Sequence, residues 1–199
     1  YRGILLEQTK CASLTHCSDE QVDKLLKYFE ARGFKPMPSK GKRAADHPGA
    51  GKARALWISL GQLGAIENPS EKALEAFARR QLHCDKLQWA DQGLIYKLIE
   101  ALKAIAERHG WRQSLDGIDA AGAVLVLKRR LIDAQMIKLR AADWVAAEWD
   151  APRAAREFGG VEVRSILSAS LTDLDQVAQV LGVEIAAAKA AGAFQCTTT

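Results

Sequence analysis

The chain has 199 residues, a net charge of +4 at pH 7 and 48% hydrophobic residues, which is typical of a folded globular protein. No apolar run approaches the roughly 20 residues of a membrane-spanning helix, and the amino terminus carries no secretory signal pattern. The four cysteines lack the spacing of a disulfide framework, so we expect reduced thiols and a cytoplasmic protein. Because the chain begins at Tyr1 and not at methionine, we also expect it to be a piece of a longer protein.

Residues 18–33 are the first predicted helix. Ser18 and Gln21 have the spacing of a capping box, and Gly33 is a typical helix end. Apolar residues recur with the helical period and form one face. This face consists of Val22, Leu25, Leu26 and Phe29.

A basic segment, residues 35–51, follows this helix. Its end, DHPGAGK, resembles a phosphate-binding loop, but Asp46 replaces the first glycine, Ala53 replaces the hydroxyl residue, and no apolar strand precedes it. We therefore reject nucleotide binding. Residues 1–55 contain seven Lys and four Arg against six acidic residues, and most of this excess lies in and just after the segment. Such charge suits phosphate backbones, although a linker kept soluble by its charge is an equal alternative.

Three more helices are predicted up to residue 110. The first helix, 54–64, ends at Gly64, and the second, 70–82, begins at the N-cap Ser70. The third helix, 91–109, is terminated by Gly110. Each has an apolar face. These faces consist of Leu56, Trp57, Leu60 and Leu63, of Leu74, Phe77 and Ala78, and of Leu94, Ile95, Leu98, Ile99, Leu102 and Ile105.

The first half of the chain contains an internal echo. A shift of 73 positions places Cys11 on Cys84 and Leu14 on Leu87, and aligns the long helices that follow. This predicts two related halves of one domain. The second half begins with an additional helix, so we expect a corresponding upstream helix to be missing from the first.

Residues 112–199 are predicted to form a separate helical domain. A long helix follows Asp119, Pro152 and the Gly159–Gly160 pair interrupt the helical pattern, and a last helical unit is capped by Thr172. Only the short VEVRSIL run at 161–167 alternates with the period of a strand.

The last helical unit also resembles a helix-turn-helix. Ala178, Gly182 and Val183 have the spacing of its turn. However, the following residues offer only Glu184 and Lys189 to read base edges, so we favour a structural pair of helices.

Other candidate sites are weaker. His16–Cys17, His83–Cys84 and Cys11 lack the spacing of zinc ligands, and no nucleophile has a supporting base, so we predict no metal, cofactor or catalytic residue. The tryptophans are expected to pack in the core and not to stack on bases. They are Trp57, Trp89, Trp111, Trp144 and Trp149.

Several segments resemble the Mu-like phage GemA proteins, over about residues 1–111. They are YRGILLEQTKCAS, VDKLLKYFEARGFKP, KARALWISLGQLGAI, SEKALEAFARRQ and LIEALKAIAERHGW. These small phage proteins are described as modulators of host gyrase expression, so the resemblance implies a regulatory role. It brings no catalytic or ligand residues with it.

We therefore predict an all-α protein: a first helical half (1–34), a basic linker (35–51), a second helical half (52–111) and a helical C-terminal domain (112–199). The predicted function is non-enzymatic phage regulation in the bacterial cytoplasm, through weak, sequence-independent contact with DNA, a host regulatory protein, or both. The alternative is an adaptor that binds only protein. The candidate nucleic-acid-binding residues are Lys40, Lys42, Arg43, Lys52, Arg54, Arg79, Arg80, Lys86 and Lys97. For Arg79 and Arg80 the alternative role is to complement a helix dipole.

Overall fold

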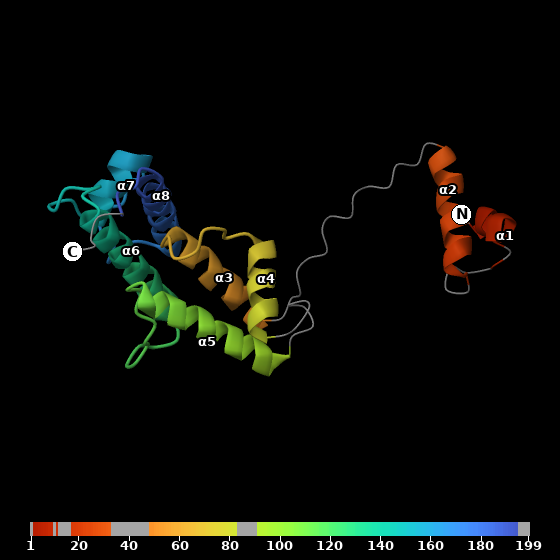
Figure 1. The fold of residues 1–199 in the computed structure, drawn as a ribbon, viewed down its shortest axis with the longest axis horizontal. Coiled ribbons are helices and arrows are strands. Elements are labelled where there is room, and N and C mark those ends of the chain that lie inside the picture. Colours follow the sequence, from red (N-terminus) through yellow and green to blue (C-terminus); the bar gives the residue numbers. More distant parts are fainter. Residues whose placement is uncertain (1, 10, 12–16, 33–47, 83–90, 195–199) are drawn as a thin grey trace. The chain divides into compact units, whose positions relative to one another are not determined.

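The computed structural model describes residues 2–9, 11, 17–32, 48–82 and 91–194 and divides the chain into two compact units, Tyr1–Arg43 and Ala44–Thr199. The described residues form eight helices and no strand, so the all-α prediction is confirmed for them (Figure 1). None of these helices combines the length and the apolar character that crossing a membrane requires.

The first unit contains α1 (Arg2–Thr9) and α2 (Asp19–Ala31). The backbone N–H of Ser18 donates to Gln21 Oε1 over 3.0 Å, and the N–H of Gln21 donates to Ser18 Oγ over 3.4 Å. The predicted capping box is therefore confirmed. Gln21 Nε2 also donates to the carbonyl of Thr9 over 3.0 Å, which joins the start of α2 to the end of α1. The predicted helix end at Gly33 lies outside the described residues.

The second unit begins with α3 (Pro48–Gln62), α4 (Glu71–Leu82) and α5 (Gln92–Arg108). The α3 helix starts earlier than predicted, so residues 48–51 of the predicted linker are helical. Ala50 and Ala53 explain this extension, because both are fully buried and lengthen the apolar face of α3. Ser70 caps α4 by accepting from the N–H of Ala73 over 3.3 Å, as predicted.

The remaining helices are α6 (Ala123–Ala141), α7 (Ala151–Gly159) and α8 (Leu171–Ala190). Pro152 lies in the first turn of α7, where proline begins a helix because no N–H bond is needed there, so its predicted role as a breaker of the preceding helix is wrong. The predicted cap Thr172 is also wrong. Ser170 is the N-cap, and it shares a capping box with Asp173.

One hydrophobic core runs through the second unit, from α3 to α8. Fully buried leucines of four helices contribute to it: Leu60, Leu98, Leu131 and Leu181. Residues on both sides of position 111 therefore share this core, while the predicted domain boundaries themselves stay predictions. The relation between the two halves also stays a prediction, because Leu14, Cys84 and Leu87 lie outside the described residues.

Two tryptophans belong to this core, as predicted. Trp57 is 6% exposed and its ring packs against Phe77, with centroids 5.3 Å apart. Trp111 is 3% exposed, and its Nε1 donates to the carbonyl of Leu127 over 2.9 Å, which joins the end of α5 to α6. Trp144 and Trp149 are half-buried. Trp89 lies outside the described residues.

The helix-turn-helix interpretation is wrong, and so is the favoured pair of helices, because α8 continues through Gly182 as one helix. Gly182 lies against the backbone of α3. A Cβ at this position would lie 3.0 Å from both the Cα and the carbonyl oxygen of Gln62. The glycine thus permits a close approach of α3 and α8 and does not form a turn.

Polar side chains of α6 reinforce this packing. Gln135 is fully buried, and its Nε2 donates to the carbonyls of Gln62 over 3.0 Å and Ala178 over 2.9 Å. Lys138 Nζ donates to the carbonyl of Leu63 over 2.9 Å and thereby satisfies a backbone acceptor just after α3. The α6 helix therefore forms hydrogen bonds with both α3 and α8.

His109 makes the stability of the second unit depend on pH. Its Nδ1 lies 3.4 Å from Lys138 Nζ. Burial, together with the charges of Lys138 and Arg108, lowers the pKa of His109 below its ordinary value of 6.5. As the pH falls through the ordinary pKa of histidine, His109 takes up a proton more readily in the unfolded chain than in the folded chain. Acidification therefore lowers the free energy of unfolding. We expect a smaller loss in His109→Gln between about pH 7.5 and about pH 5.5, measured by urea unfolding. The raised pKa of Asp133 acts in the opposite direction in both proteins, so the comparison isolates His109. Equal losses in the two proteins would contradict this assignment.

Candidate nucleic-acid interface

The described candidate basic residues lie on three consecutive helices of the second unit. Lys52 and Arg54 belong to α3, Arg79 and Arg80 to the last turn of α4, and Lys97 to α5. Lys40, Lys42, Arg43 and Lys86 lie outside the described residues. From the sequence, Arg79, Arg80, Lys86 and Lys97 are expected to form one basic face together with Lys52 and Arg54. Because Lys86 is among the residues not described, this grouping stays a prediction.

The two candidates on α3 differ in their surroundings. Lys52 is exposed and forms no ion pair within the described part of the chain. The Nε of Arg54 donates to Glu71 Oε1 over 2.7 Å, and the arginine side chain is 26% exposed. Arg54 therefore links α3 to the first turn of α4. Glu71 already neutralises part of the arginine's charge, so Arg54 is a weaker candidate for a phosphate contact.

Arg79 and Arg80 are exposed at the carboxyl end of α4. This position is also where positive side chains complement the helix dipole, so the structural alternative stays open for both. Lys97 is exposed on α5. Exposure permits a phosphate contact at all three residues, because such contacts require charge and access and little fixed geometry.

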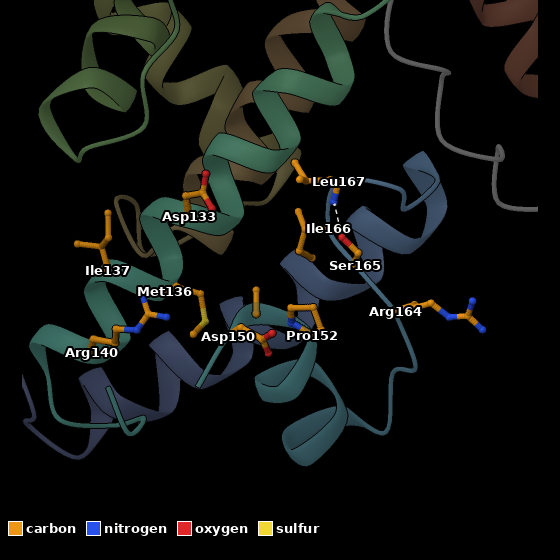
Figure 2. A pocket seen from close by; sticks show the side chains of 11 residues that line it. Asp133, Met136, Ile137, Arg140, Asp150, Pro152, Arg164, Ser165, Ile166 and Leu167 are labelled. Carbon is orange, nitrogen blue, oxygen red and sulfur yellow. Dashed lines mark hydrogen bonds between the residues drawn. The ribbon is translucent and has the colours of Figure 1, made fainter. Parts of the chain in front are cut away.

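A cavity of about 490 Å³ lies near the carboxyl-terminal part of the unit, between α6, the start of α7 and residues 164–167 (Figure 2). Its charged side chains are largely used by the fold. Arg140 donates to the carbonyl of Trp149 over 2.6 Å, and Asp150 accepts from the N–H of Arg153 over 2.9 Å as the cap of α7. Figure 2 shows Arg164 directed away from the cavity. Burial raises the pKa of Asp133.

This arrangement contains little that could do chemistry. Opposite charges at the cavity hold local backbone groups, and no pairing of a nucleophile with a base is formed by its lining residues. Within the described ranges, no cluster of three or more His, Cys, Asp or Glu side chains could hold a metal ion.

A second cavity, of about 400 Å³, lies between α3, α5 and the start of α6. Apolar side chains form most of its wall, and Lys52, Lys103 and Lys128 line it as well. Sequence reasoning missed Lys103 and Lys128. Each lies on a predicted helix with ordinary helical spacing, and only the connection between α5 and α6 brings them to the same cavity.

The comparison with protein families covers helices α1 to α5. The family model described as "Bacteriophage Mu, GemA protein" matches residues 1–108, which is more than half of the chain. The chain belongs to the GemA family. The predicted resemblance is thereby confirmed. The GemA match ends at Arg108, the last residue of α5, so α6, α7 and α8 lie beyond it.

A curated relative supports the GemA assignment. The Mu-like prophage FluMu protein gp16 of Haemophilus influenzae is 31% identical over 99 residues, which cover 43% of this chain and 54% of gp16. The chain thus spans about half the length of this relative. No solved structure matches the chain. The hydrophobic core joins the GemA segment to the residues beyond it. Helices α3, α4 and α5 of the matched segment contribute buried residues to this core, and so do α6, α7 and α8.

Proposed function

We propose that this GemA-family chain is a non-enzymatic regulatory protein of a Mu-like phage or prophage. It acts in the cytoplasm of the bacterial host by weak, sequence-independent contact with DNA. The observation that carries this proposal is the charge of residues 35–54, which contain six Lys and Arg residues and a single acid, Asp46. Phosphate backbones attract such charge without demanding a fixed geometry.

The exposure of Lys52, at the carboxyl end of this basic run, supports the proposal. Lys52 is exposed in the first half of α3, so a helix of the folded unit continues the charge of the linker. Arg54 contributes less because Glu71 already accepts a hydrogen bond from it. The proposed contact therefore relies on Lys40, Lys42, Arg43 and Lys52, with Arg79 and Arg80 as secondary contributors.

A second candidate function is a protein-binding adaptor without nucleic-acid contact. The apolar cavity between α3, α5 and α6 favours this candidate, because concave apolar sites lined by a few polar groups are typical binding sites. On this alternative the basic segment only keeps the chain soluble. The partner would be a host regulatory protein.

A variant with Lys40, Lys42, Arg43 and Lys52 replaced by glutamine separates the two functions. Arg54 is kept because it links α3 to α4. Each phosphate contact contributes about −0.9 to the slope of log affinity against log salt concentration, so the four replacements should flatten this slope by roughly 2 to 4. Fluorescence anisotropy of a labelled duplex at several salt concentrations measures the slope.

A matched control removes four exposed bases of the second unit that lie outside the basic segment. These are Lys72, Arg112, Arg156 and Arg164. The control variant has the same net charge as the linker variant, so a similar loss of slope in both would assign the effect to total charge and reject the proposed segment. Capture of a host protein that survives nuclease treatment, in a wild type that does not bind DNA, would support the adaptor instead.

A further inference from the structure

The cavity between α3, α5 and the start of α6 combines an apolar wall with a positive rim. Trp111, Val124 and Leu127 contribute apolar surface, and Lys52, Lys103 and Lys128 contribute the charge. Among the described residues, none that lines the cavity is acidic. Its volume of about 400 Å³ lies within the range of ~300–1,000 Å³ that ligand pockets usually have.

Val124 marks the open side of this cavity. Its side chain is 53% exposed, although it is a large apolar residue next to the buried ring of Trp111. An exposed apolar residue at the mouth of an apolar cavity gains stability when a partner covers it. The wall therefore favours an occupant with an apolar side chain.

The lysines restrict the chemistry of that occupant. Lys103 Nζ lies 2.7 Å from Glu100 Oε1, and Lys128 Nζ lies 2.5 Å from Asp175 Oδ1, outside the cavity wall. Both pairs are partly exposed, and an ammonium group has three donors, so each lysine can also bind a further carboxylate. Lys52 has no acidic partner within the described part of the chain. The rim is thus complementary to negative charge.

We propose that this cavity is the docking site for an acidic amphipathic segment of a protein partner. One or more apolar side chains of the segment enter the cavity, and its Asp or Glu side chains face the three lysines. This inference goes beyond the proposed DNA contact and does not depend on it, although Lys52 serves both. The mode is the usual one for an amphipathic helix in a groove, with charge complementarity setting the partner.

The test uses the whole chain and two synthetic peptides. Both carry leucine at every third or fourth position; one has glutamate at the remaining positions and its twin has lysine. We expect the glutamate peptide, and not the lysine twin, to shift the backbone amide signals of residues that line the cavity. Shifts absent with both peptides, or equal with both, would overturn the proposal.

Val124→Glu provides the matching protein variant. The new carboxylate lies in the first turn of α6, where no acidic residue is present and where the helix dipole favours negative charge. This carboxylate can pair with the lysines in place of the peptide. We therefore expect the affinity of the variant for the glutamate peptide to fall at least about tenfold. Val183→Glu is the control, because Val183 is 61% exposed on α8 and does not line the cavity.

Each further outcome decides the question. Equal affinity of Val124→Glu and wild type would overturn the proposal, and so would a duplex DNA that shifts the cavity signals when the glutamate peptide does not. Thermal unfolding of the variant reports whether it folds. If it does not fold, the comparison of the two peptides on the wild type still decides.

Discussion

Replacing Leu181 by alanine is expected to lower the free energy of unfolding of the second unit by about 2–5 kcal/mol. Leu181 is fully buried on α8, in the core that α8 shares with α3, α5 and α6. The substitution removes apolar surface from this core and leaves a cavity that the surrounding helices fill only partly. Urea unfolding followed by circular dichroism measures the loss.

The same variant tests whether the GemA segment and the following residues unfold together. Because they share one core, we expect amide hydrogen exchange to accelerate in α5 as well as in α6, α7 and α8. Acceleration confined to residues after position 111 would instead support a separate C-terminal domain. Leu171→Ala is the control on the same helix; Leu171 is 44% exposed, so its effect should stay within about 0.5 kcal/mol.

Replacing Gly182 by valine is the second large expected effect. A Cβ at this position would lie 3.0 Å from backbone atoms of Gln62, which cannot move without displacing α3. We expect a loss of about 1–3 kcal/mol, the usual cost of overfilling a packed contact, although valine has the better helix propensity.

Gly51→Val is the matched control for this substitution. Gly51 also lies inside a helix, α3, and an added Cβ would meet nothing within 4 Å. We expect this change to be neutral or slightly stabilising, because glycine is the poorer helix former. A similar loss at both positions would show that close packing of α3 and α8 is not the reason for Gly182.

Local signals in the sequence predicted most helices correctly. Ser18 with Gln21, and Ser70 before an apolar helical pattern, are caps whose partners lie within three residues, so no other part of the fold is needed to recognise them. The same holds for the helix ends at Gly64 and Gly110, which have φ angles of 69° and 83°.

The errors arose where contacts distant in sequence decide between similar local patterns. Ser170 and Thr172 each have an aspartate three residues later, so both match a capping box. Asp175, the partner of Thr172 in this pattern, instead pairs with Lys128 of α6, and Ser170 becomes the cap. Gly182 matched a turn for a similar reason: its contact with α3 is invisible in the local sequence.

The candidate site shows the same division. The sequence identified the basic segment, because net charge needs no structure to recognise. It did not predict that Arg54 binds Glu71, a residue 17 positions later, since this pair exists only when α3 and α4 pack together. Nor could it bring Lys52, Lys103 and Lys128 to one cavity, because their convergence depends on how the chain turns between α5 and α6.

The central claim, direct contact between the basic segment and DNA, is tested most directly by titrating the wild-type chain onto a duplex at low and high salt. We expect binding at micromolar protein in low salt, equal affinity for unrelated sequences, and a log–log salt slope of roughly −3 to −6. These values follow from a few neutralised phosphates and no readout of base edges. An absence of binding at micromolar protein in low salt would contradict the claim and leave the protein-binding adaptor as the function.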